Sequence, residues 1–98
     1  MLKNYYKKEG FKMSNLEVYK NIKNELLKDD NIYEVSVNST RGLVTIKPVQ
    51  NKPFMNLKDP LENFMDDELI IICGREFKLA KYEHFNTQIF ELVLKEVG

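Results

Sequence analysis

The chain has 98 residues with one cysteine and one histidine, and its 15 basic side chains balance 15 acidic ones. This length is that of one domain, and a lone cysteine excludes an internal disulfide. A neutral chain has no general electrostatic attraction to nucleic acid or anionic lipid. Its longest apolar run, residues 69–73, is far shorter than the about 18 residues of a membrane span, so we expect a cytoplasmic protein that binds no membrane.

Residues 1–12 form a basic segment in front of a second methionine, Met13. The codons of residues 8–10 can read AAGGAGG, the purine run that bacterial ribosomes pair with upstream of a start codon. The segment is therefore either an untranslated leader or a disordered tail, and it lacks the apolar stretch of a signal peptide. We expect residues 13–98 to form a single α+β domain. Removing the four lysines and one glutamate of the segment leaves 11 basic and 14 acidic side chains.

An amphipathic helix is predicted for residues 15–28. Ser14 and Glu17 have the spacing of a capping box, and apolar side chains follow at helical spacing. These side chains are Leu16, Tyr19, Ile22 and Leu26.

A β-hairpin is predicted for residues 33–38 and 44–47. In both segments apolar and polar side chains alternate with the period of a half-buried strand. Pro48 has no N–H group to donate to a sheet, so it should end the second strand. The alternating apolar residues are Tyr33, Val35, Val37, Val44 and Ile46.

Residues 48–60 contain all three prolines and should form a loop. Three apolar side chains lie in it: Phe54, Met55 and Leu57. On a proline-stiffened loop they offer an adaptable contact surface to a partner, or else they cover the core. Asp59 is predicted to cap a short helix that begins at Pro60.

A second hairpin is predicted for residues 69–73 and 77–83, with Gly74 at the first central position of a type II′ turn. The strand of residues 69–73 is the most apolar segment and should be central in the sheet.

Residues 86–97 are predicted to form a helix capped by Asn86. The alternation of Phe90, Leu92 and Leu94 leaves a strand open as the alternative. Together the segments predict an α+β fold, a four-stranded antiparallel sheet with helices packed on one face, in the order α-β-β-α-β-β-α.

Catalytic chemistry has few candidates in this sequence. Cys73 and His84 would lie about 26 Å apart along a strand that rises about 3.3 Å per residue, whereas a nucleophile and its base need hydrogen-bond contact. Cys73 is therefore interpreted as a small buried thiol. No glycine-rich phosphate loop is present. We expect no enzymatic activity, no cofactor and no metal site.

An acidic cluster occupies ten residues that contain no lysine or arginine: Asp59, Glu62, Asp66, Asp67 and Glu68. The last three crowd the predicted C-terminal end of a helix, where the macrodipole disfavours negative charge. Three interpretations remain open: a solvated junction, a divalent-cation site without EF-hand order, or a surface that binds a basic partner.

A basic and aromatic strand gives a competing hypothesis. Its residues Arg75, Lys78, Lys81 and Tyr82 have the composition of a surface that stacks on single-stranded nucleic acid. Glu76 and Glu83 dilute its charge, so binding to nucleic acid is the less favoured expectation.

The hypothesis that the sequence favours is a small non-enzymatic protein of bacterial or phage type that binds a basic protein. Its mode would be inhibition of a nucleic-acid-handling enzyme, with carboxylates in the basic groove of that enzyme. The contact surface would combine the three apolar loop residues with the acidic cluster. The alternatives are a nucleic-acid-binding module and a self-associating structural protein, for example a homodimer.

Overall fold

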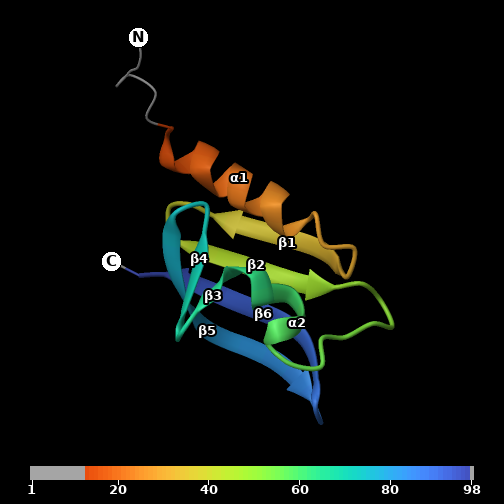
Figure 1. The fold of residues 1–98 in the computed structure, drawn as a ribbon. Coiled ribbons are helices and arrows are strands. Elements are labelled where there is room, and N and C mark those ends of the chain that lie inside the picture. Colours follow the sequence, from red (N-terminus) through yellow and green to blue (C-terminus); the bar gives the residue numbers. More distant parts are fainter. Residues whose placement is uncertain (1–12, 98) are drawn as a thin grey trace.

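The structure, a computed structural model, describes residues 13–97 and contains one antiparallel sheet with helices on one face (Figure 1). The predicted α+β class is confirmed, but the sheet has six strands instead of four. The predictions for residues 1–12 lie outside the described residues. The elements are α1 (Asn15–Leu26), β1 (Ile32–Asn38), β2 (Leu43–Pro48), α2 (Lys58–Leu61), the 3₁₀ turn η1 (Glu62–Phe64), β3 (Met65–Asp66), β4 (Leu69–Ile72), β5 (Arg75–Phe85) and β6 (Gln88–Glu96).

The strand order in the sheet is β1-β2-β6-β5-β4-β3. The last strand in the sequence, β6, therefore lies in the middle of the sheet and pairs with β2 on one side and β5 on the other. The predicted helix over residues 86–97 is wrong, and the alternative strand is correct. Asn86 does not cap a helix but occupies the β5–β6 turn with a φ of 57°. Hydrogen-bonding partners on both edges of β6 outweigh a local capping signal.

Helix α1 begins as predicted. The Ser14 hydroxyl accepts a hydrogen bond from the Glu17 amide, and the Glu17 carboxylate accepts one from the Ser14 amide. The helix buries Tyr19, Ile22 and Leu26 as expected, together with Val18. Leu16, which we assigned to the apolar face, is 52% exposed, because the face turned toward the sheet passes through Val18 instead.

The β1–β2 hairpin forms as predicted and β2 ends at Pro48. Tyr33 is the exception, because the expected inward side chain is 71% exposed. Ile32 pairs with Pro48 and Glu34 with Lys47, so Tyr33 is an extra, bulged residue. A bulge shifts the alternation by one position, and Ile32 enters the core in place of Tyr33.

The turn between β4 and β5 lies one residue earlier than predicted. Ile72 pairs with Arg75, so the two turn residues are Cys73 and Gly74. Both have positive φ, 52° and 78°, which is the pattern of a type I′ turn and not of type II′. Cys73 is consequently exposed, whereas we expected a buried thiol.

The core lies between the helices and the inner face of the sheet. Val35, Val44 and Leu94 line the sheet face below α1, and Leu61 brings α2 into the same cluster. The largest fully buried side chains are Tyr19, Phe54, Phe77, Ile22, Leu26, Ile46, Leu61, Ile72, Leu92, Leu94, Val35 and Val44.

A polar network fastens α1 to the two longest strands. The hydroxyl of Tyr19 donates a hydrogen bond to Oε1 of Glu96 in β6. Nη1 of Arg75, at the start of β5, lies 3.0 Å from Oε2 of Glu96 and 2.8 Å from Oδ1 of Asn15. The Tyr19 ring also packs edge-to-face on Phe77, with centroids 6.1 Å apart. Because Tyr19 is fully buried, its hydroxyl needs this partner.

The Tyr19 hydroxyl gives a pH-dependent prediction. Burial first, and then the hydrogen bond to Glu96, raise the pKa of Tyr19 far above its ordinary value of 10.0. The unfolded chain therefore loses this proton at lower pH than the folded chain does. Above about pH 10 the free energy of unfolding should fall as pH rises.

The variant Tyr19→Phe should have a free energy of unfolding about 1–2 kcal/mol lower at neutral pH, because Glu96 loses one hydrogen bond. Its free energy of unfolding should also fall less steeply as pH rises above about 10, because the titrating hydroxyl is absent. Urea unfolding at neutral and alkaline pH measures both effects. Tyr33→Phe, at an exposed tyrosine, is the control and should match the unmodified chain. Equal alkaline declines for the two variants would contradict the assignment.

Candidate functional site

The apolar loop residues of the predicted contact surface have different environments. Phe54 is only 2% exposed, and its backbone pairs with Ile89 of β6 through hydrogen bonds of 3.0 and 2.7 Å. Leu57 is half-buried and packs against the core. Met55 is 54% exposed. Of these three side chains, Met55 is therefore the most exposed to solvent, while Phe54 covers the core.

Asp59 does not cap α2, which begins at Lys58 after Leu57 at the N-cap position, and Asn56 just before it bonds the first amides. Oδ1 of Asn56 accepts hydrogen bonds from the amides of Lys58 and Asp59, at 2.8 and 3.2 Å. Asp59 instead turns back along the loop, and its Oδ2 accepts a hydrogen bond of 2.6 Å from the Met55 amide. The Asp59 carboxylate thus stabilises the loop.

The other acidic residues lie in a hairpin and not at the end of a helix. Asp66 ends β3, and Asp67 with Glu68 forms the turn into β4. Asp67 has a φ of 57°, a conformation that aspartate tolerates better than most residues. The macrodipole premise is therefore wrong for these three residues, because α2 and η1 have already ended. All three side chains are exposed.

A second group of carboxylates joins the predicted cluster in space. Glu25 and Asp29, from the end of α1 and the turn after it, line the same depression as Asp59 and Glu62. This depression of about 500 Å³, with these four carboxylates, is called the acidic hollow below. One cation lies among them, Lys28, whose Nζ is 2.8 Å from Oε2 of Glu25. The fold therefore concentrates negative charge from two segments far apart in the sequence.

The residues of the nucleic-acid alternative do not share one surface. Arg75 is bound to Glu96 and Asn15 on the inner side of the sheet. Lys78 and Lys81 are exposed. In the register of the sheet they lie opposite Lys95 and Val93 of β6. Tyr82, next in sequence to Lys81, points to the opposite face of the strand.

The structure also separates Cys73 from His84. Cys73 lies in the turn before β5, and His84 lies near the far end of that strand. Loss of hydration around the sulfur, with the charge of Glu25 added, raises the pKa of the Cys73 thiol. A raised pKa disfavours the thiolate that a nucleophile requires.

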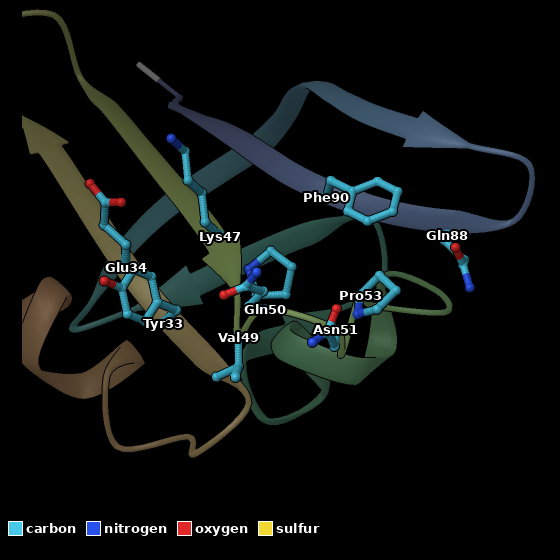
Figure 2. A pocket seen from close by; sticks show the side chains of 10 residues that line it. Tyr33, Glu34, Lys47, Val49, Gln50, Asn51, Pro53, Gln88 and Phe90 are labelled. Atoms are coloured by element: carbon cyan, nitrogen blue, oxygen red, sulfur yellow. The ribbon is translucent and has the colours of Figure 1, made fainter.

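A further depression, of about 730 Å³, lies beside the end of β2. Figure 2 shows Gln50 between Tyr33 on one side and Phe90 on the other, with Pro53 close to Phe90. Tyr33 and Phe90 are both bulged residues, since Glu83 pairs with Glu91 and His84 with Ile89. This aromatic hollow has the mixture of rings and amides that binding surfaces use.

Sequence reasoning missed the aromatic hollow because a bulge reverses the direction of a side chain. The visible signal was weak: Ile32 and Tyr33 are adjacent apolar residues at the start of a strand that otherwise alternates. In β6, the side-chain direction of Phe90 was not predicted, because residues 86–97 were expected to form a helix. The acidic hollow was missed in part, because Glu25 and Asp29 meet Asp59 only through tertiary folding.

No family model matches the chain, and neither the comparison with curated proteins nor that with solved structures found a match. Over residues 13–97, no three or more His, Cys, Asp or Glu side chains are grouped as a metal ion would require. The same stretch has no helix with the length and apolar character to cross a membrane. Function must therefore be argued from the surfaces themselves.

The difference in burial between Phe54 and Met55 predicts different effects of substitution on the free energy of unfolding. Phe54→Ala should lower the free energy of unfolding by about 3–5 kcal/mol, because it removes a buried aromatic ring. Met55→Ala should change it by less than about 0.5 kcal/mol, because that side chain is exposed. Urea unfolding of both variants tests the difference. Equal losses would show that the loop does not pack in this way.

Proposed function

We propose that the protein is a small cytoplasmic binding protein without catalytic activity of its own, and that its partner is a basic protein. The observation that supports this most strongly is the acidic hollow. Its carboxylates come from α1, the turn after α1, α2 and η1, and η1 is followed in the sequence by the hairpin of Asp66, Asp67 and Glu68. The exposed hairpin adds three further carboxylates in the segment that follows the hollow.

The electrostatics of this surface favour a cationic partner. Carboxylates held near one another repel, and a concave site concentrates their field. Lys28 offsets part of this charge, but it is already paired with Glu25. A lysine or arginine of a partner that enters the hollow would lower the free energy of the remaining carboxylates. Met55, exposed on the adjoining loop, adds an apolar contact of adaptable shape.

The negative charge of this surface indicates which class of partner could bind it. Exposed carboxylates can occupy the cationic sites of a groove that otherwise binds the phosphate backbone of nucleic acid. A nucleic-acid-handling enzyme has such a groove, so we place inhibition of such an enzyme first. Direct binding of nucleic acid is the less supported alternative, because Arg75 is already paired with Glu96.

A matched pair of charge reversals tests the proposal. Glu62→Lys with Glu68→Lys changes the acidic surface, and Glu34→Lys with Glu76→Lys makes the same change of charge on exposed strand positions elsewhere. Each lost surface pair is worth about 0.2–1 kcal/mol, and reversal adds repulsion. The first variant should therefore bind the partner with an affinity reduced about tenfold.

The partner is obtained by affinity capture on the unmodified full-length chain from the source cell at low salt, and its affinity is then measured by calorimetry. Raising the salt should weaken binding. The control variant should bind as the unmodified chain does. Equal affinities for the two variants, or a captured partner without a basic surface, would contradict the proposal. A mobility shift with nucleic acid alone would favour the alternative.

A further inference from the structure

The β5–β6 hairpin extends past the other strands at its turn (Figure 1). Strand β4 pairs with β5 only at residues 75–77. From Lys78 to Phe85 the edge of β5 that faces away from β6 has no partner strand within residues 13–97. A free edge of this length presents unpaired N–H and C=O groups that another strand can bind.

The side chains along this edge are unusually exposed and aromatic. All residues from 80 to 87 are exposed on a hairpin that otherwise belongs to the centre of the sheet. Phe85 is 68% exposed, and the rings of Tyr82 and His84 lie 5.2 Å apart on one face. Exposed aromatic side chains next to a free edge are typical of interaction surfaces.

The charges on the other face of the hairpin restrict how a second copy could pair. Lys81 and Glu83 are two residues apart and therefore share a face. In a symmetric antiparallel pair, residues that face each other must come from the same face. Centring the pair on Lys81 places Lys81 against its own copy, and centring it on Glu83 places Glu83 against its own copy. Centring it on Tyr82 places Lys81 of each copy opposite Glu83 of the other copy.

We propose that two copies of the chain associate through residues 80–84 of β5, antiparallel, with Tyr82 on the two-fold axis. On one face Lys81 and Glu83 form two reciprocal ion pairs. On the other face the Tyr82–His84 stacks of the two copies meet across the axis. Lysine on a free edge ordinarily opposes edge pairing, but here Glu83 supplies the matching charge. Because the segment is short, the association is reversible and depends on concentration.

The test uses sedimentation velocity on the full-length chain over a wide concentration range. Lys81→Glu turns both ion pairs into carboxylate–carboxylate pairs, and Glu83→Lys turns both into lysine–lysine pairs. Each single variant should therefore associate with an affinity reduced about tenfold. The double variant exchanges the charges and should recover association. A mixture of the two single variants should form a heterodimer, because both of its cross-strand pairs then join a carboxylate to a lysine.

Folding and specificity have separate controls. Both side chains are exposed, so the single variants should keep the thermal unfolding of the unmodified chain, and heterodimer formation would itself show that both are folded. Glu62→Lys with Glu68→Lys should dimerise normally, which separates this inference from the proposed function. A monomeric unmodified chain, single variants that associate as it does, or a double variant that stays monomeric would each overturn the proposal.

Discussion

The structure depends on the position of β6, which is the last strand in the sequence and lies between β2 and β5. Both edges of this strand are used, by β2 over residues 43–46 and by β5 over most of its length. Its end also supplies Glu96, which joins Tyr19 of α1 to Arg75 of β5. Because these partners are far apart in the sequence, the two halves of the sheet are joined only when the C-terminal segment pairs with both.

The surfaces that we assign to binding follow from this arrangement. The backbone pairing of Phe54 with Ile89 holds the loop that leads to α2, and so it sets where Asp59 and Glu62 lie relative to α1. Phe90, the bulged residue of β6, lines the same hollow as Tyr33. The length of the β5–β6 pair beyond β4 leaves the free edge. One central strand thus positions the acidic hollow, the aromatic hollow and the exposed hairpin.

Local signals in the sequence predicted local structure well. The Ser14–Glu17 capping box and the alternation of Val35, Val44 and Ile46 all correspond to what forms, because each depends on residues close in the chain. The failures have a common physical cause. Burial at Tyr33 depended on a bulge against β2, and the C-terminal segment depended on two partner strands. Neither can be read from a local pattern.

The candidate site shows the same division. The sequence identified the carboxylates from Asp59 to Glu68, but the reason it suggested, repulsion by a helix dipole, does not apply to a hairpin turn. Asp67 is instead suited to its positive φ. The proposed partner surface is instead a tertiary feature, in which Glu25 and Asp29 meet Asp59 and Glu62 around one hollow. Sequence order could not show it, because the helix and the loop are separated by a complete hairpin.

The two proposals use different elements, and this has a consequence for affinity. The acidic surface belongs to α1, α2 and the β3–β4 turn, whereas self-association uses the β5 edge. A dimer joined at β5 would therefore leave both acidic hollows available. A dimer with two hollows would bind a partner that has two basic sites at a matching spacing more tightly than a monomer with one hollow would. The reason is that the second contact is intramolecular. A small domain with weak individual charge pairs would reach useful affinity in this way without a larger interface.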